Sequence, residues 1–199
     1  MTHGKAGTLS ADTIVGFLAD IFARRGGDEY LGEAVTMAEH MLQGAHFAEQ
    51  DGEDEIIITA ALLHDIGHFT SEFGTFSMQD TTDRYHEEAG ARLLSQFFPP
   101  VVVECVRQHV PAKRYLCAAR PEYLGKLSEA SIHSLALQGG PMSAGEIAAF
   151  EGQPHLEEII KVRHYDDRGK IADFETPPFS HFAPMVQSVV DAYCNPAVS

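Results

Sequence analysis

Hydrophobic residues recur at three- and four-residue spacing along almost the whole chain. The first stripe, with Ser10 placed to cap the helix it predicts, consists of Leu9, Ile14, Phe17, Leu18, Ile21 and Phe22. The same spacing predicts further helices at about 33–49, 53–65, 86–97, 100–110, 128–137, 143–150, 155–164 and 181–194. No segment alternates polar and apolar residues as a half-buried strand would, so the predicted fold is all-α.

Glycine, proline and hydroxyl residues separate these segments. Gly26 and Gly27 follow the first helix, and Gly67 is expected to end the third one shortly after the pair His64-Asp65. Residues 69–84 show no clear period and are rich in Thr, Ser and Asp. They predict a loop, which we expect to shape the entrance to a site.

Length and charge narrow the range of functions. The 199 residues fit one domain, and no repeat or linker divides them. The net charge of −15 disfavours binding to nucleic acid or to an anionic membrane. Without a long apolar segment or a signal-like N-terminus, we expect a cytoplasmic protein. Three cysteines without CxxC spacing indicate neither a disulfide framework nor a thiolate metal site.

The adjacent pair His64-Asp65 lies at the end of a strongly apolar segment. Burying an imidazole beside a carboxylate is unfavourable unless another group compensates both. A divalent metal does so, and mixed imidazole and carboxylate ligands are typical of iron, manganese or zinc rather than calcium.

This pair and its surroundings resemble the HD-domain superfamily. His40 stands where that family has its first histidine, His64-Asp65 is the doublet, and His86 and His109 match the additional histidines of binuclear members. The resemblance implies an all-α HD-domain helical bundle, a single domain over residues 1–199 with its core at about 28–170. It also implies two metals, the first bound by His40, His64, Asp65 and Asp166, and the second by His86 and His109 with Asp65 bridging.

Several segments are similar to one subgroup, the mixed-valence diiron oxygenases related to myo-inositol oxygenase. These segments are YLGE at 30–33, HDIGH at 64–68, HVPAKRYL at 109–116, 127–142 with QGGPM, and RHYD at 163–166. The likeness implies an Fe(II)/Fe(III) pair and O2-dependent cleavage of a carbon–phosphorus bond. Its substrate would be (R)-1-hydroxy-2-(trimethylammonio)ethylphosphonate, giving phosphate and glycine betaine, or the unmethylated amine, giving phosphate and glycine.

The same resemblance assigns substrate residues. Lys113, Arg163 and Ser131 match positions that bind the phosphonate. Two cations one helical turn from metal ligands also favour an anion in so acidic a chain. Tyr30 and Glu33 match a lid pair over the metals.

We expect Tyr30 and Glu33 to share a helix face, with Gly26-Gly27 as the hinge. His68 is expected near Glu33, as an acid or base.

The residues around the amine end of the substrate bear on whether its nitrogen is methylated. Met37 and Ala38, close to His40 in sequence, offer a small apolar surface, and we expect Tyr30, Tyr115 and Tyr165 nearby, which favours a quaternary ammonium group.

Two other functions stay open. One is an HD-domain phosphohydrolase acting on a small phosphate ester or nucleotide, and the other is a non-catalytic metal- or ligand-binding regulator. The presence of His68 in HDIGH favours the oxygenase, because binuclear HD phosphodiesterases commonly have lysine there, as HDxGK.

Overall fold

The computed structural model describes residues 9–30, 32–70, 83 and 85–196. Its helices are α1 (Ala11–Arg25), α2 (Met37–Gln50), α3 (Glu55–Leu63), α4 (Gly67–Thr70), α5 (His86–Leu94), α6 (Pro100–Ala119), α7 (Pro121–Leu124), α8 (Glu129–Leu137), α9 (Ala144–Glu151), α10 (Leu156–Arg168) and α11 (Phe179–Cys194). Within these residues the only strand-like pairing is one isolated bridge, between Glu29 and Thr36. The prediction of an all-α fold is confirmed.

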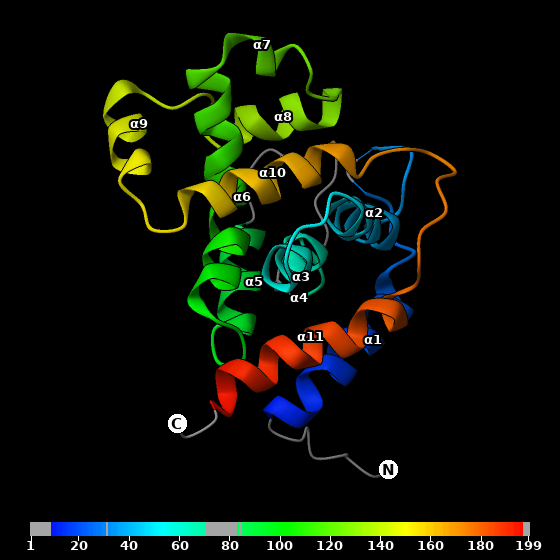
Figure 1. Ribbon diagram of the computed structural model, residues 1–199. Coiled ribbons are helices and arrows are strands. Elements are labelled where there is room, and N and C mark those ends of the chain that lie inside the picture. The colour runs from blue at the N-terminus through cyan, green and yellow to red at the C-terminus, as the bar shows by residue number, and fades with distance from the viewer. Residues whose placement is uncertain (1–8, 31, 71–82, 84, 197–199) are drawn as a thin grey trace, which may run out of the picture.

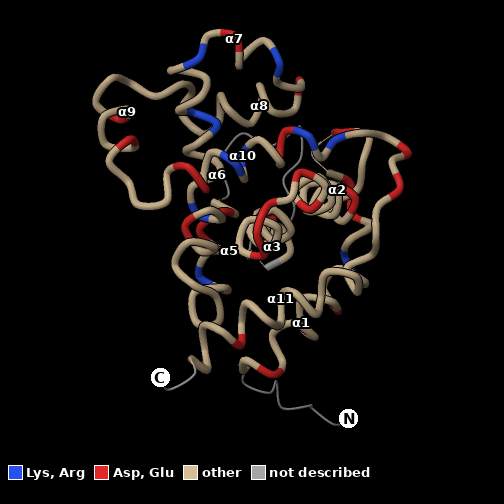
Figure 2. The backbone as a smooth tube through the Cα atoms, in the orientation of Figure 1, with Lys and Arg blue, Asp and Glu red and all other residues tan. Residues whose placement is uncertain are grey.

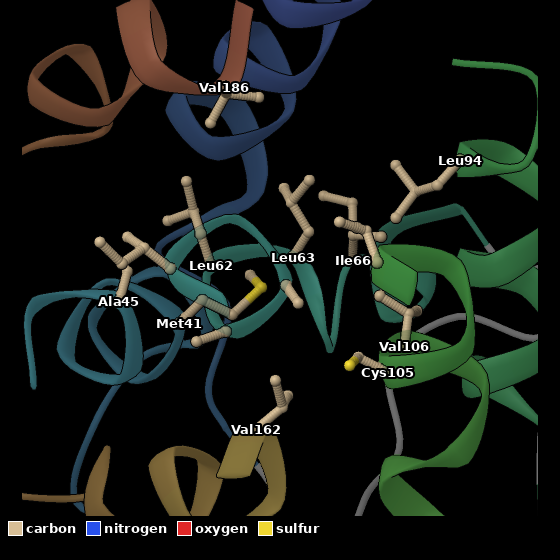
Figure 3. Packing of buried hydrophobic residues seen from close by; sticks show 14 of the residues in the cluster. Met41, Ala45, Leu62, Leu63, Ile66, Leu94, Cys105, Val106, Val162 and Val186 are labelled. Carbon is tan, nitrogen blue, oxygen red and sulfur yellow. The ribbon is translucent and has the colours of Figure 1, made fainter. Parts of the chain in front are cut away.

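Helix α3 lies at the centre of the bundle (Figure 1). Seven consecutive residues, 57–63, are buried, because α3 is apolar on every side and is covered by α2, α6, α10 and α11. Figure 3 shows Leu62 and Leu63 of α3 among the side chains of the surrounding helices. The residues on both sides of the His64-Asp65 pair are therefore fixed by packing.

Smaller groups of helices pack at the two ends of this core (Figure 1). Helices α1 and α11 pack on each other beneath α3, whereas α7, α8 and α9 lie at the opposite end. That end has its own small apolar cluster, made by Leu116, Cys117, Tyr123 and Leu135. Acidic positions are spread over most of the backbone with basic ones among them (Figure 2).

Several helices differ in length from their prediction: α5 ends at Leu94 rather than 97, α10 extends to Arg168 rather than 164, and α2 and α6 differ for clear physical reasons. Helix α2 begins at Met37 rather than near residue 33, because Thr36 caps it: its hydroxyl accepts from the Glu39 amide at 3.3 Å, and its own amide donates to the Glu39 carboxylate at 2.7 Å. Helix α6 continues through Pro111 to Ala119 instead of ending at 110. One proline removes one backbone hydrogen bond, and the packing of α6 on α5 and α10 outweighs that loss.

Gly67 does not end a helix but begins α4. A Cβ atom at this position would lie 1.8 Å from the carbonyl oxygen of His86 and 2.7 Å from the amide nitrogen of Gly90. The glycine is therefore required where α4 crosses the start of α5. Of the predicted loop at 69–84, residues 71–82 and 84 lie outside the described residues, and residues 69 and 70 belong to α4.

None of the described helices combines the length and apolar character needed to cross a bilayer. The cysteines are free thiols: Cys105 and Cys117 are buried and Cys194 is half-buried.

Candidate metal centre and anion pocket

Six buried side chains predicted as metal ligands come together from five parts of the chain. They are His40 of α2, His64 and Asp65 of the turn after α3, His86 at the start of α5, His109 of α6 and Asp166 of α10. None is more than 8% exposed. The structure therefore brings together all the residues that the resemblance names, although their role as ligands stays a proposal.

The four imidazoles form two pairs. Nε2 of His40 lies 2.9 Å from Nε2 of His64, and Nε2 of His86 lies 3.1 Å from Nε2 of His109. Asp65 stands between the pairs. Its Oδ2 atom is 3.5 Å from Nε2 of both His40 and His64, and its Oδ1 atom is 3.2 Å from Nε2 of both His86 and His109. One carboxylate thus offers one oxygen to each pair.

Backbone carbonyls fix the orientation of the rings. Nδ1 of His40 lies 2.8 Å from the carbonyl oxygen of Gly169, and Nδ1 of His64 lies 2.8 Å from that of Ala61. Nδ1 of His109 makes the same kind of contact, at 2.7 Å, with the carbonyl three residues before it. Since a carbonyl only accepts, Nδ1 carries the proton and donates. When one of these three rings is neutral, the lone pair of its Nε2 atom therefore points into the cluster.

Two Nε2 atoms at these distances require either a proton or a metal ion between them. Cis ligands at about 2.1 Å from one metal are about 3 Å apart, which matches both imidazole pairs. Asp166 supports this interpretation, because its Oδ1 atom is 3.5 Å from Nε2 of His40 and has no hydrogen-bond partner among the described residues. The donor set therefore fits metal ions, with Asp65 placed to bridge two of them.

The carboxylates of this cluster are held in the ionised form. Burial raises the pKa of Asp65, but the surrounding imidazoles, His64 foremost, outweigh it and hold the pKa well below its usual range. For Asp166, burial is likewise outweighed, chiefly by Arg163, and the pKa is lowered. Burial lowers the pKa of His64, but the charges of Asp65 and Asp166 outweigh burial and raise that pKa to about 9, so a metal ion that binds at Nε2 of His64 would displace a proton.

His68 is a further buried imidazole of this cluster. Its ring stacks on His86 with a centroid distance of 3.9 Å, and its Nε2 atom lies 3.8 Å from Oδ1 of Asp65. That nitrogen has no hydrogen-bond partner among the described residues, and burial lowers its pKa well below the usual value. With Asp65 and His86 it forms a group that could itself hold a metal.

Tyr30 and Glu33 lie in a turn before α2, so the prediction that they share a helix face is wrong. The amide of Glu33 donates to the carbonyl of Tyr30 at 2.7 Å, and the amide of Tyr30 donates to Val35 at 3.3 Å. The Tyr30 ring nevertheless lies where a lid would: it stacks on His40 at 3.9 Å with an interplanar angle of 14° and is 4% exposed.

Gly26 is a packing position, contrary to its predicted part in a hinge. A Cβ atom there would lie 2.3 Å from the carbonyl oxygen of Phe22 and 2.6 Å from Cβ of Ala38. The amide of Ala38 also donates to the carbonyl of Gly26 at 2.9 Å. The end of α1 and the start of α2 are thus in close contact at Gly26, whereas Gly27 faces open space.

A pocket opens directly onto the cluster. Its lining residues with polar side chains are Tyr30, Glu33, Asp65, His68, Asp83, His86, His109, Lys113, Ser131, Ser134, Gln138, Arg163, Asp166 and Lys170. All the residues predicted to bind substrate are in this set. Glu33 and His68, which were predicted to lie near each other, both line this pocket but contact different residues. The Glu33 carboxylate accepts from Ser128 and lies 3.7 Å from Nζ of Lys170, whereas the His68 ring stacks on His86.

The two predicted cations differ in their partners. The ammonium of Lys113 is 4% exposed and donates to Oγ of Ser134 at 2.7 Å, and burial, followed by the charge of Arg163, lowers its pKa to about 7. Arg163 is neutralised more completely, because it binds Oδ2 of Asp166 at 2.6 Å and also binds Asp167. Lys113 is therefore the cation with more capacity to bind an anion, and Arg163 also orients Asp166.

The surface expected for the amine end is not at this pocket. The hydroxyl of Tyr115 donates to Glu151 at 3.0 Å, and the hydroxyl of Tyr165 lies 3.2 Å from carboxylate oxygens of Asp51 and Glu53. Met37 is fully buried and, like Ala38, is not among the lining residues. Of that set only Tyr30 lines the pocket, so the expectation is wrong for the other four.

Sequence reasoning assigned no role to four polar lining residues, Asp83, Ser134, Gln138 and Lys170. Lys170 follows Asp166 by four residues and lies just past the end of α10, so a helix extended through 168 would have placed it near the ligands. Gln138 belongs to the QGGPM segment at the end of α8.

Comparison with known proteins agrees with this geometry. The family model for the HD domain matches residues 37–138. A [1-hydroxy-2-(trimethylamino)ethyl]phosphonate dioxygenase (glycine-betaine-forming) of Leisingera caerulea is 65% identical over 193 residues, covering 97% of this chain and 98% of that protein. A hydroxymethylphosphonate dioxygenase of Gimesia maris is 40% identical over 166 residues, covering 83% of each chain.

Proposed function

Since the chain belongs to the HD-domain family and, within it, to the phosphonate dioxygenases, we propose that it cleaves the carbon–phosphorus bond of [1-hydroxy-2-(trimethylamino)ethyl]phosphonate with dioxygen, releasing phosphate and glycine betaine. The observation that carries this proposal is the cationic pocket that opens onto a buried carboxylate flanked by two imidazole pairs. The identity of 65% to a relative of that specificity supports the choice of substrate over its unmethylated analogue.

The proposed cofactor is a pair of iron ions. His40, His64, Asp65 and Asp166 would hold one ion, and His86 and His109 the other, with Asp65 shared. When bound, a mixed-valence iron pair supplies the binding and reduction of dioxygen, which side chains alone do not provide. Ligands from five parts of the chain keep the two ions in a fixed relation to the pocket.

The side chains of the pocket orient the substrate. Lys113 and Arg163 would bind phosphonate oxygens through charge-assisted hydrogen bonds, and Ser131 adds a neutral partner. Because these groups lie beside the ligand cluster, the bound phosphonate brings the adjacent C1 carbon toward the metals. Orientation of this kind lowers the entropic part of the barrier.

Tyr30 and His68 occupy opposite ends of the cluster. The Tyr30 ring covers His40, and burial, with the charges of Asp65 and Asp166, raises the pKa of its phenol well above the usual value. Tyr30 is therefore a protonated group that excludes water from this side of the site. His68, neutral and without a described partner for Nε2, is placed to accept a proton.

The overall reaction balances with dioxygen alone. The C1–H and C1–P bonds break, C1 gains oxygen to become the carboxylate of glycine betaine, and phosphorus gains one oxygen to become phosphate. This is a four-electron oxidation of the substrate, and one dioxygen molecule accepts all four electrons. No external reductant is required.

A test of this function compares phosphate release in air and under strict anaerobiosis. The iron-loaded enzyme is given the trimethylammonium phosphonate, its unmethylated analogue and a nucleoside monophosphate. We expect release from the trimethylammonium compound in air only. Equal release without dioxygen, or release from the nucleotide alone, would identify an HD-domain phosphohydrolase instead.

A further inference from the structure

Lys170 is a cation of the pocket that neither the motifs nor the comparisons assign. Its side chain is 13% exposed and lines the same pocket as Lys113 and Arg163. It has three polar partners within the pocket: Nζ donates to Oγ of Ser131 at 2.8 Å, and it lies 3.7 Å from Oε1 of Glu33 and 4.0 Å from Oδ1 of Asp166. Lys170 therefore contacts both the turn before α2, through Glu33, and helix α8, through Ser131.

The backbone on both sides of Lys170 is fixed to α2. The carbonyl of Gly169 accepts from Nδ1 of His40 at 2.8 Å. The amide of Ile171 donates to the Gln43 side chain at 3.0 Å, and that side chain donates back to the carbonyl of Ile171 at 2.9 Å. Three hydrogen bonds therefore place Lys170 relative to the same helix that carries His40, so its ammonium is a pre-positioned group rather than a mobile surface lysine.

The charges around Lys170 are arranged for a ligand that carries both signs. The cations Lys113 and Arg163 line the same pocket, and the charge of Lys170 is among those that lower the pKa of Lys113. Lys170 also lies close to the Glu33 carboxylate and to the Tyr30 ring, whose centroid is 5.8 Å from Nζ of Lys170. A carboxylate beside an aromatic face is a binding environment for an ammonium group.

We propose that Lys170 is a third anion-binding side chain of this pocket, paired with Glu33 and, at longer range, with Asp166 in the empty enzyme, and that the ammonium of a zwitterionic substrate replaces it as the partner of Glu33. The proposal rests on the proposed function for the identity of that substrate. Binding then replaces the Lys170–Glu33 ion pair with two new ones: Glu33 with the substrate cation, and Lys170 with the phosphonate.

The exchange predicts different effects for two substrates. For [1-hydroxy-2-(trimethylamino)ethyl]phosphonate, Glu33 has a cation to bind, so Glu33→Gln weakens binding. Hydroxymethylphosphonate has no cation, so Glu33 only competes for Lys170, and Glu33→Gln strengthens binding. Lys170→Met weakens the binding of both, by about 10-fold or more for a charge-assisted hydrogen bond in a buried site.

The experiment is calorimetric titration of the iron-loaded enzyme without dioxygen, which measures dissociation constants without turnover. Lys161→Met is the matched control, because Lys161 is an α10 lysine paired with Glu53 and 40% exposed outside the pocket. We expect Lys161→Met to bind as the wild type does, Lys170→Arg to stay within about threefold because it keeps the charge, and Lys170→Met to lose at least about tenfold.

Equal dissociation constants in Lys170→Met and Lys161→Met would overturn the proposal, as would Glu33→Gln shifting both phosphonates in the same direction. An equal loss in Lys170→Arg and Lys170→Met would also overturn it, since packing rather than charge would then account for the effect. Phosphate release by the wild type in air tests the proposed function separately, so the two can fail independently.

Discussion

Gly67→Ala tests whether the contact between α4 and α5 sets the position of His86, one of the proposed metal ligands. The added Cβ would lie 1.8 Å from the carbonyl oxygen of His86 and 2.7 Å from the amide nitrogen of Gly90. Both are backbone atoms, so the steric clash can be removed only if α4 or α5 moves. Overpacking costs typically about 1–3 kcal/mol, and two backbone obstacles favour the upper end. For a domain of this size about 3 kcal/mol lowers Tm by about 6–12 °C.

The same displacement acts on the site. His86 is the first residue of α5, and its Nε2 atom lies 3.1 Å from that of His109. A shift of α5 separates the pair, so we expect Gly67→Ala to bind close to one iron per chain instead of two. The assays are thermal unfolding by circular dichroism, with and without a chelator, and iron analysis of the loaded protein.

Gly16→Ala is the control for this variant. Gly16 lies within α1, and a Cβ atom there meets nothing within 4 Å. Replacing a glycine inside a helix by alanine is expected to stabilise the protein by about 0.5–1 kcal/mol. If Gly67→Ala unfolds at the wild-type temperature and retains the wild-type iron content, the contact between α4 and α5 does not position His86.

Three other predictions concern the site. His86→Ala and His109→Ala should each lose about one iron per chain, and two irons in both variants would remove these residues from the ligand set. Burial lowers the pKa of the Lys113 ammonium to about 7, so its positive charge is lost as the pH rises through 7 and phosphonate binding should weaken above that pH. Lys113→Arg should keep its charge and its affinity there. Equal pH dependence of phosphonate binding in the wild type and Lys113→Arg would contradict the role of Lys113. Tyr30→Phe should keep both irons but consume dioxygen faster without substrate, and equal rates of autoxidation would exclude gating by Tyr30.

The sequence predicted the parts of the fold that depend on local pattern. The apolar stripe at 9–22 corresponds to α1, and the continuous apolar run after Asp54 corresponds to the buried helix α3. The candidate ligands followed from a resemblance to the HD-domain family, and the structure gathers all of them around Asp65. Local pattern was less informative where packing decides, as at Pro111, where α6 continues because its neighbours support it.

Features that depend on contacts distant in sequence were not predicted. The turn containing Tyr30 and Glu33 closes through the pairing of Glu29 with Thr36, which the helical periodicity did not reveal. The placement of Lys170 depends on hydrogen bonds between α2 and the chain beyond α10, more than one hundred residues apart, as the 129-residue separation of His40 and Gly169 illustrates. Spacing alone does not report such contacts.

The most direct test of the central claim is the stoichiometry of the reaction. Dioxygen uptake and phosphate release are measured together on the iron-loaded enzyme with [1-hydroxy-2-(trimethylamino)ethyl]phosphonate and no added reductant. The account predicts one dioxygen consumed for each phosphate released, with release stopping when the dissolved dioxygen is exhausted. Phosphate release that continues after dioxygen is exhausted, or that occurs without any uptake, would contradict it.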